Sequence, residues 1–276
     1  MNISFLQTFL TVIETGNLNK AAERLHVTQS TVTTRLDALE EALGQPLLIR
    51  SRSGTRLTRA GFELRPHAEV LVNRWAQVRK AVSLPEGFSG LFSFACEYDV
   101  WHDAGKKWLY GARANHTDLA IEARHGRRAE ITAWLGSGIT DAAMTQEPLP
   151  GPGLISKEFT QQKIVKVSSL PEADGEQPPA VYVDLGIDFR RQHSQAFPDT
   201  QTAGITFSTS AWALEHLLEH GGSAYLPLTL CQPWLDSGEL LRVADVLEFS
   251  RPLYLVWREV NQENFPWLLD VHQPDK

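Results

Sequence analysis

Six neighbouring polar side chains near the start of the chain could bind a partner by hydrogen bonding. They are Gln29, Ser30, Thr31, Thr33, Thr34 and Arg35. The set offers hydroxyl, amide and guanidinium groups without a carboxylate, so it can approach base edges and phosphates without like-charge repulsion. A helix that lies in the major groove of double-stranded DNA needs this chemistry. The side chains must then be presented by a helix whose opposite face is buried.

Two short helices joined by a tight turn are predicted to carry these side chains. Asn17 and Thr28 are suitable N-caps, because their side chains can accept hydrogen bonds from the free amides of a first helical turn. Apolar residues recur at helical spacing: Leu18, Ala21, Ala22 and Leu25 in the first helix, and Val32, Leu36, Leu39 and Leu43 in the second. A preceding helix over Ser4–Glu14 would complete their core. The pattern predicts a helix-turn-helix.

A basic stretch, residues 46–61, follows this motif. Two arms, Leu47–Arg50 and Thr55–Leu57, flank the turn pair Ser53-Gly54 and predict a two-stranded wing. Its arginines are Arg50, Arg52, Arg56 and Arg59, and no acid occurs between Glu41 and Glu63. Such side chains suit phosphate contacts that release counterions. A merely solvated basic hairpin is the weaker alternative beside a helix-turn-helix.

Charge is distributed unevenly along the chain. Residues 1–83 carry a net charge of +4 and the remainder −11, within a total of −7. A basic head on an acidic body fits a protein that docks one end on DNA. The two cysteines, Cys96 and Cys231, are too few for a disulfide framework and are expected to be reduced, buried thiols in the cytosol. No signal peptide is recognisable in Met1–Ile13, and no apolar run is long enough to span a membrane, so a cytoplasmic protein is expected.

A long helix is predicted from Arg59 or Ala60 to Val82, with Thr58 as its cap. Its apolar residues recur at a/d heptad spacing: Leu64, Ala68, Leu71, Trp75, Val78 and Val82. Such a seam packs along another helix, and no helix of matching length lies nearby in the sequence. We favour the same helix of a second subunit as the partner, the alternative being that the seam covers this chain's own domains.

The pattern of apolar and polar residues changes after Gly87. Short apolar runs alternate with amphipathic stretches from Leu91 onward, which favours a parallel α/β sheet. The Pro/Gly-rich passage Glu147–Gly153 is predicted to cross between two subdomains. Later predicted strands include Lys163–Val167 and Ser250–Val256, with a helix over Ser210–His220.

This order of parts resembles the LysR-type transcriptional regulators over essentially the whole chain. The resemblance rests on AAERLHVTQSTVT, LEEALG and RLTRAG between Phe5 and Gly61, and on GGSAYLPLTL at Gly221–Leu230. The segment SRPLYLVWRE is similar to a short subgroup that includes a flagellar-operon regulator. The fold so implied is an α+β multidomain protein: a winged helix-turn-helix at 1–59, a linker or dimerisation helix at 60–83, and a two-lobed α/β domain at 88–276 that resembles periplasmic binding proteins. Lobe I would span about 88–149 plus 250–270, and lobe II about 154–249.

The resemblance implies a sequence-specific DNA-binding regulator that acts as a homodimer or a dimer of dimers. By position, Gln29, Thr33 and Thr34 should approach bases. The phosphate backbone should be held by Ser30, Thr31, Arg50, Arg52 and Arg56. The family often has Ser-Arg where this chain has Thr33-Thr34, with the arginine one place later at Arg35. A bidentate arginine–guanine contact from position 34 is therefore absent, which changes the bases that are read.

The family often holds a small-molecule effector between the two lobes. At the turn that commonly supplies hydroxyl residues this chain has Cys96-Glu97-Tyr98-Asp99. Two acids there would repel a carboxylate ligand unless they point outward or cap helices, so the expected effector is neutral or cationic, or the pocket is empty. The candidate effector-binding residues are Tyr98, Thr145, Gln146 and Ser208.

One motif invites a catalytic interpretation. His216-Leu217-Leu218-Glu219-His220 matches the H-x-x-E-H pattern of inverted zinc peptidases, but it lies at a helix end where histidines are favoured anyway. Other nucleophile, phosphate-loop and cofactor patterns are missing. We expect no enzyme, no metal and no cofactor. Three hypotheses are therefore weighed: a regulator that senses a small molecule, a regulator whose C-terminal domain serves oligomerisation and contacts with RNA polymerase, and, least favoured, a metallohydrolase with a DNA-binding head.

Overall fold

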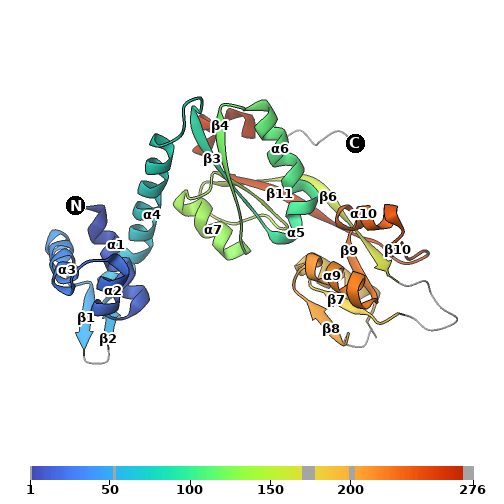
Figure 1. The fold of residues 1–276 in the computed structure, drawn as a ribbon, viewed down its shortest axis with the longest axis horizontal. Helices are drawn as coiled ribbons and strands as arrows, with labels where there is room; N and C mark the ends of the chain where they lie inside the picture. The colour runs from blue at the N-terminus through green and yellow to red at the C-terminus, as the bar shows by residue number, and fades with distance from the viewer. Residues whose placement is uncertain (1, 52–53, 170–177, 199–202, 270–276) are drawn as a thin grey trace. The chain divides into compact units, whose positions relative to one another are not determined.

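The computed structural model describes residues 2–51, 54–169, 178–198 and 203–269. The chain divides into two compact units, Met1–Leu91 with Ser137–Ile139, and Phe92–Gly136 with Thr140–Lys276. Figure 1 shows the helical head with its long helix, and the larger unit built around a sheet. Each unit has its own hydrophobic core and is described separately below.

The head is a three-helix arrangement with the predicted caps. Its helices are α1 (Ile3–Thr15), α2 (Leu18–Leu25) and α3 (Gln29–Leu43). Asn17 accepts hydrogen bonds from the amides of Asn19 and Lys20, and Thr28 accepts one from the amide of Thr31 at 3.2 Å. Their shared core includes Leu6, Phe9, Val12, Ala21, Val32, Leu36 and Leu39. Leu43 differs from its predicted inner position, because it lies in the last turn and is 43% exposed.

The wing consists of β1 (Leu48–Ser51) and β2 (Gly54–Leu57), paired antiparallel with Leu48 opposite Leu57. Arg52 and Ser53, at its predicted turn, lie outside the described residues. The start of β1 is tied to α3 by Glu40, whose Oε1 accepts from the amides of Leu47 (2.7 Å) and Leu48 (3.1 Å). The wing is therefore anchored to the same helix that carries the polar set.

The long helix α4 spans Arg59–Val82, and Thr58 caps it by accepting from the amide of Gly61 at 3.0 Å. The predicted seam divides into two parts. Leu64 and Ala68 pack into the core of the head, Ala68 with no exposed surface. At these two positions the seam is covered by the chain's own head, which is the alternative stated above. The remaining positions are exposed on the single chain: Leu71, Trp75, Val78 and Val82, the last by 80%.

The larger unit is built on a seven-stranded sheet of order β10-β6-β11-β5-β3-β4, with β9 paired to β6. Its strands are β3 (Gly90–Cys96), β4 (Leu119–His125), β5 (Ala142–Thr145), β6 (Leu154–Ser168), β9 (Ser223–Pro227), β10 (Leu241–Arg242) and β11 (Phe249–Arg258). A separate parallel pair is formed by β7 (Val181–Val183) and β8 (Ile205–Phe207). The expected parallel sheet is found only in part: β3 and β5 are parallel, but β6 and β11 are antiparallel to each other and to their other described neighbours.

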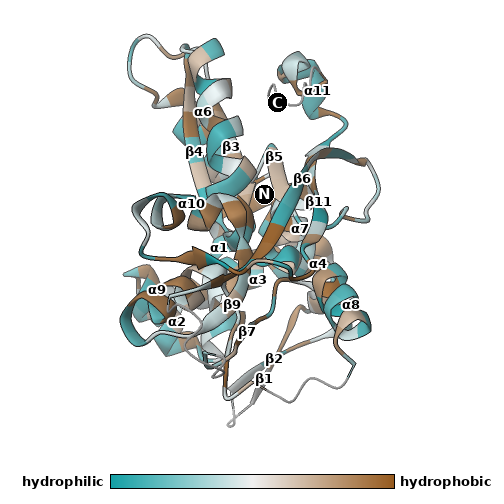
Figure 2. Cartoon of the chain, turned by 90° about the vertical axis from the view of Figure 1, so that its right-hand side faces the viewer, coloured by the Kyte–Doolittle hydropathy of each residue, from teal (hydrophilic) through white to brown (hydrophobic). Residues whose placement is uncertain are grey.

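Helices cover the sheet on both lobes. They are α5 (Tyr98–Val100), the π-helical turn Trp101–Gly105, α6 (Lys106–Asn115), α7 (Arg128–Ser137), α8 (Ile187–Ala196), α9 (Ser210–His220), α10 (Leu228–Ser237), α11 (Asn261–Asn264) and the 3-10 turn Pro266–Leu268. The helices and the long strands both carry hydrophobic and hydrophilic residues, as expected for elements that bury one face (Figure 2).

The two lobes are joined by the long strands β6 and β11, which run side by side from one lobe to the other (Figure 1). Along β6, Phe159 belongs to the core of lobe I and Ile164 to that of lobe II; along β11, Phe249 and Leu253 make the same change in reverse. The passage at 147–153 is therefore a connection before β6, and its prediction as the crossing is wrong. A hydrogen-bonded ladder with one register shift, between Leu253 and Tyr254, carries the chain between the lobes rather than a proline-rich linker.

Candidate functional site

The outer face of α3 is polar and exposed at its N-terminal end. Gln29, Ser30 and Thr34 are exposed, and Thr33 is half-buried. The Gln29 amide donates to the Thr33 hydroxyl at 3.3 Å, and the Thr34 hydroxyl donates to the Ser30 carbonyl at 3.0 Å. These bonds pre-orient side chains that still have free donor and acceptor capacity.

Thr31 and Arg35, two further members of the predicted DNA-binding set, also have internal partners. The Thr31 hydroxyl lies 2.8 Å from that of Thr28 in the helix cap. Arg35 Nη1 donates to the Thr8 hydroxyl of α1 at 3.4 Å, and Arg35 is half-buried. Arg35 thus braces α1 against α3, which sequence spacing alone did not reveal.

The wing presents part of the predicted basic set. Arg56 is exposed on β2, opposite Ile49 of β1, which is 57% exposed. Arg50 pairs with Thr55 through the backbone ladder, but its side chain and the whole of Arg52 lie outside the described residues. Glu40 was missed by sequence reasoning, because an acid within a helix gives no sign that it bonds to a strand.

A cavity of about 680 Å³ lies between the two lobes of the larger unit. Three of the four predicted effector-binding residues, Tyr98, Gln146 and Ser208, line it. Thr145 does not: it has no exposed surface, and its hydroxyl donates to the Glu147 carbonyl at 2.7 Å. Trp212, which was not predicted, lines the cavity and is 54% exposed, compared with 45% for Tyr98.

Two of the acids at this cavity, Glu97 and Asp99, bind backbone amides. Glu97 Oε2 accepts from the Gln146 amide at 2.6 Å, and Asp99 Oδ1 accepts from the Ser210 amide at 2.8 Å. Burial raises the pKa of both carboxyls, while these amides and the charge of Arg251 act in the opposite direction. Asp99 therefore caps the start of α9, whereas Glu97 binds an amide that follows β5 and caps no helix.

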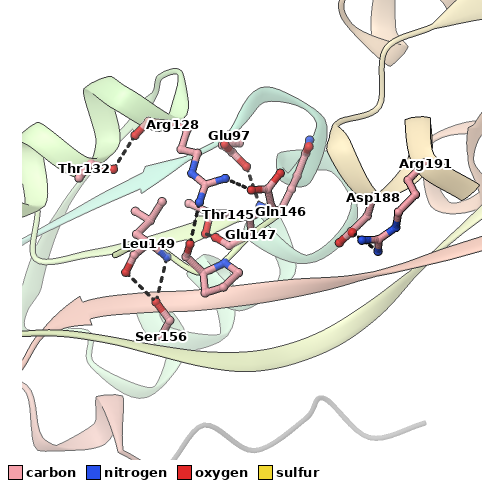
Figure 3. A network of polar contacts seen from close by, with 11 residues as sticks. Glu97, Arg128, Thr132, Thr145, Gln146, Glu147, Leu149, Ser156, Asp188 and Arg191 are labelled. Carbon is pink, nitrogen blue, oxygen red and sulfur yellow. Dashed lines mark hydrogen bonds and ion pairs between the residues drawn. The ribbon is translucent and has the colours of Figure 1, made fainter. Parts of the chain in front are cut away.

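Polar contacts extend this arrangement within lobe I (Figure 3). Arg128, at the start of α7, forms an ion pair with Glu147 and donates to the Pro148 carbonyl at 2.9 Å. On lobe II, Asp188 and Arg191 of α8 form their own ion pair (Figure 3). The cavity wall therefore carries several charges that are already matched by internal partners.

A buried arginine was not predicted at all. Arg251 on β11 is 2% exposed, and its Nε donates at 2.6 Å to Oε1 of Gln162, its register partner on β6. Nη1 and Nη2 have no hydrogen-bond partner within the described part of the chain. Burial lowers the pKa of Arg251 to about 10, although Asp99, Glu97 and Asp103 hold it up. In the sequence, nothing distinguishes Arg251, between Ser250 and Pro252, from an ordinary exposed arginine.

The remaining predicted features are placed as follows. Cys96 and Cys231 are free and buried, and burial raises the pKa of both thiols. His216 and His220 lie on α9 with ring centroids 5.0 Å apart. Among the described residues there is no group of three side chains able to hold a metal ion. Nor does any described helix have the length and apolar character to cross a membrane.

A winged helix-turn-helix head, a long helix with an exposed apolar seam and a two-lobed domain with a cavity together define a DNA-binding transcriptional regulator. Residues 3–62 match the family described as "Bacterial regulatory helix-turn-helix protein, lysR family", and residues 85–270 match the "LysR substrate binding domain". The chain belongs to the LysR family of transcriptional regulators.

Known relatives agree with this assignment. The regulator HdfR of Salmonella schwarzengrund is 29% identical over 279 residues, covering 100% of this chain and 98% of the relative. Among solved structures, CbnR in complex with its target DNA has a TM-score of 0.69 at 20% identity, covering 98% of this chain and 97% of that chain. ArgP from Mycobacterium tuberculosis has a TM-score of 0.56 at 23% identity, covering 97% and 94%. At these identities the structures support the shared fold.

Proposed function

We propose that this regulator reads its operator with the N-terminal half of α3 and holds the phosphate backbone with the wing. The observation that carries the proposal is the acid-free polar face of Gln29, Ser30, Thr33 and Thr34, of which only Thr33 is half-buried. Arg50, Arg52 and Arg56 supply the phosphate contacts, and Thr31 supports the helix start. Arg35 contributes by bracing α1 rather than by reading a base. The structure of CbnR, solved with its target DNA, belongs to a protein of the same fold.

Two copies of the chain associate through the exposed part of α4. An exposed apolar stripe runs along the second half of this helix, formed by Leu71, Trp75, Val78 and Val82. A stripe of this kind is stabilised by a matching helix. The resulting dimer places two recognition helices on two half-sites, and further pairing gives a dimer of dimers.

The C-terminal domain senses a neutral or cationic molecule in the inter-lobe cavity. Five acids and three arginines line the cavity, and the exposed rings of Tyr98 and Trp212 can face a cation. This lining suits an amine better than a carboxylate. LysG of Corynebacterium glutamicum, a protein of the same fold, has been solved with arginine as its bound effector. The alternative is a ligand-free domain used for oligomerisation and polymerase contacts. The observation in its support is that Glu97 and Asp99 already have internal partners. No catalytic role is assigned, and the protein acts in the cytoplasm.

A DNA-binding titration of the full-length protein tests the main proposal. An operator is selected from a random duplex library, and its affinity is measured across salt concentrations for the wild type and for Arg56→Ala. Removal of one phosphate contact should weaken all duplexes about equally and reduce the magnitude of the salt slope by about 1. Arg113→Ala, which removes the same charge from α6, should leave both quantities unchanged. An Arg56→Ala protein with unaltered affinity and slope contradicts the role of the wing.

A further inference from the structure

Asp99 connects the two lobes at the floor of the inter-lobe cavity. It belongs to α5 of lobe I, but its carboxylate accepts at 2.8 Å from the amide of Ser210, the first residue of α9 in lobe II. The first amides of a helix have no partner within the helix, and together with the helix dipole they attract anions. α9 is 11 residues long, so its N-terminus is a complete helix end.

The guanidinium of Arg251 supplies positive charge near the Asp99 carboxylate. Arg251 is almost fully buried, and Nη1 and Nη2 find no hydrogen-bond partner among the residues that the structure describes. Of the acids that act on Arg251, Asp99 has the largest effect. A Cβ on Gly186, a residue of the cavity wall with φ of 101°, would lie 3.5 Å from Arg251 Nη1. The guanidinium thus lies directly behind the cavity lining.

The geometry of this carboxylate is set by the strands that join the lobes. Gln162 has no exposed surface; its Nε2 donates to the Asp99 carbonyl at 3.1 Å, and its Oε1 accepts from Arg251 Nε at 2.6 Å. Gln162 and Arg251 face each other at the point where β6 and β11 pass from one lobe to the other. The backbone of Asp99 and the side chain of Arg251 are therefore fixed relative to one another.

We propose that Asp99 is an internal ligand that determines the specificity of the cavity: its carboxylate occupies the N-terminus of α9, in the field of the buried Arg251, and so excludes carboxylate effectors. The inference rests on the proposal that the inter-lobe cavity is the sensor site. A carboxylate that entered the wild-type cavity would find the helix amide taken and would lie beside Glu97 and Asp99. Removal of the Asp99 carboxylate leaves a vacancy of the size of a formate ion beside the Ser210 amide, in the field of the Arg251 guanidinium.

Chemical rescue of full-length Asp99→Ala with sodium formate tests this inference. Melting temperature is followed up to several hundred millimolar formate and compared with sodium chloride at equal ionic strength. Because formate has only three heavy atoms, binding no tighter than about millimolar is expected. At ten times its dissociation constant, formate should raise the melting temperature by about 3–5 °C. The rise should saturate, and the bulkier acetate should act more weakly.

Matched variants make the outcome decisive. Asp103→Ala removes an acid one turn later on the same helical segment, where Asp103 accepts from the Thr229 hydroxyl at 3.1 Å rather than from a helix amide. It should show no formate effect beyond that of chloride, and neither should the wild type. Should Asp99→Ala not fold, Asp99→Ser leaves a similar vacancy and should respond in the same way.

The inference would be overturned if formate raised the melting temperature of the Asp99 variants no more than chloride does. It would also be overturned if formate raised the melting temperature of the wild type as much as that of the variants. Failure of the proposed function has a different signature. A wild type that no amine or neutral compound stabilises would refute the sensor role of the cavity, yet the formate response of Asp99→Ala would be unchanged, because that response depends only on contacts within the C-terminal domain.

Discussion

Glu40 controls the position of the wing, and its removal should release the wing without unfolding the head. Its carboxylate accepts from two amides, at 2.7 Å from Leu47 and 3.1 Å from Leu48. Both leucines are buried, at 1% and 8% exposure, so their amides cannot simply turn to water. In Glu40→Ala these two donors lose their partner while the apolar side chains of α3 stay in place.

The size of the effect follows from these contacts. A hydrogen bond to a charged group contributes about 1.5–3 kcal/mol, and the half-buried position of Glu40 allows water to replace part of it. A local loss of about 2–3 kcal/mol for the pair is expected, which corresponds to about a 30- to 150-fold increase in local opening. Glu40→Gln keeps one acceptor oxygen and should lose less.

Hydrogen exchange of the full-length protein measures this opening directly. Amides of Leu47 and Leu48 should exchange faster in Glu40→Ala, while those of the α1 core keep their protection. Operator affinity should fall as well, because the wing arginines are no longer pre-positioned. Glu41→Ala removes an exposed acid one position later and serves as the control. Unchanged exchange at the two leucines would refute the anchoring role of Glu40.

Three further predictions concern the seam, base reading and pH. Trp75→Glu places a charge in the exposed α4 seam and should shift sedimentation from dimer to monomer, unlike Ala76→Glu, which adds the same charge at the adjacent exposed position outside the seam. Gln29→Ala should cost about 1–3 kcal/mol of discrimination at one base pair in competition with substituted operators, and an equal loss on every duplex would argue against base reading. Burial raises the pKa of Asp99 above its ordinary value of about 3.9, so the folded state holds this proton more tightly and stability is lost as pH rises through the raised pKa. Between the ordinary and the raised pKa of Asp99, the melting temperature of the wild type should therefore fall relative to that of Asp99→Asn as pH rises. A relative rise would contradict the direction of the pKa shift.

The head could be predicted closely because its determinants are local. Asn17, Thr28 and Thr58 cap the helices they were expected to cap, since a side chain next to its own helix end needs no distant partner. The inner positions of α3 follow from helical spacing in the same way, and only Leu43, in the last turn, departs. The split of the α4 seam was not predictable, because heptad spacing marks an apolar face but not which neighbour covers it.

The sensor domain depends more on long-range pairing. Strand positions were predicted from apolar runs, but the antiparallel course of β6 and β11 depends on pairing between residues some 90 positions apart. Tyr98, Gln146 and Ser208, which were chosen because they follow predicted strands, line one cavity. Thr145 was chosen in the same way but does not line it, because its hydroxyl donates to the Glu147 carbonyl.

By itself, the sequence determined that the chain is a DNA-binding regulator with a helix-turn-helix, a wing and an apolar helix, because each of these is encoded by short-range periodicity and caps. Only the tertiary structure decided that Asp99 binds the start of α9, that Gln162 and Arg251 meet where the lobes join, and that Glu40 holds the wing. The physical reason is that burial and long-range hydrogen bonds turn an ordinary charged residue into a specific one, and neither is visible in the spacing of residues along the chain.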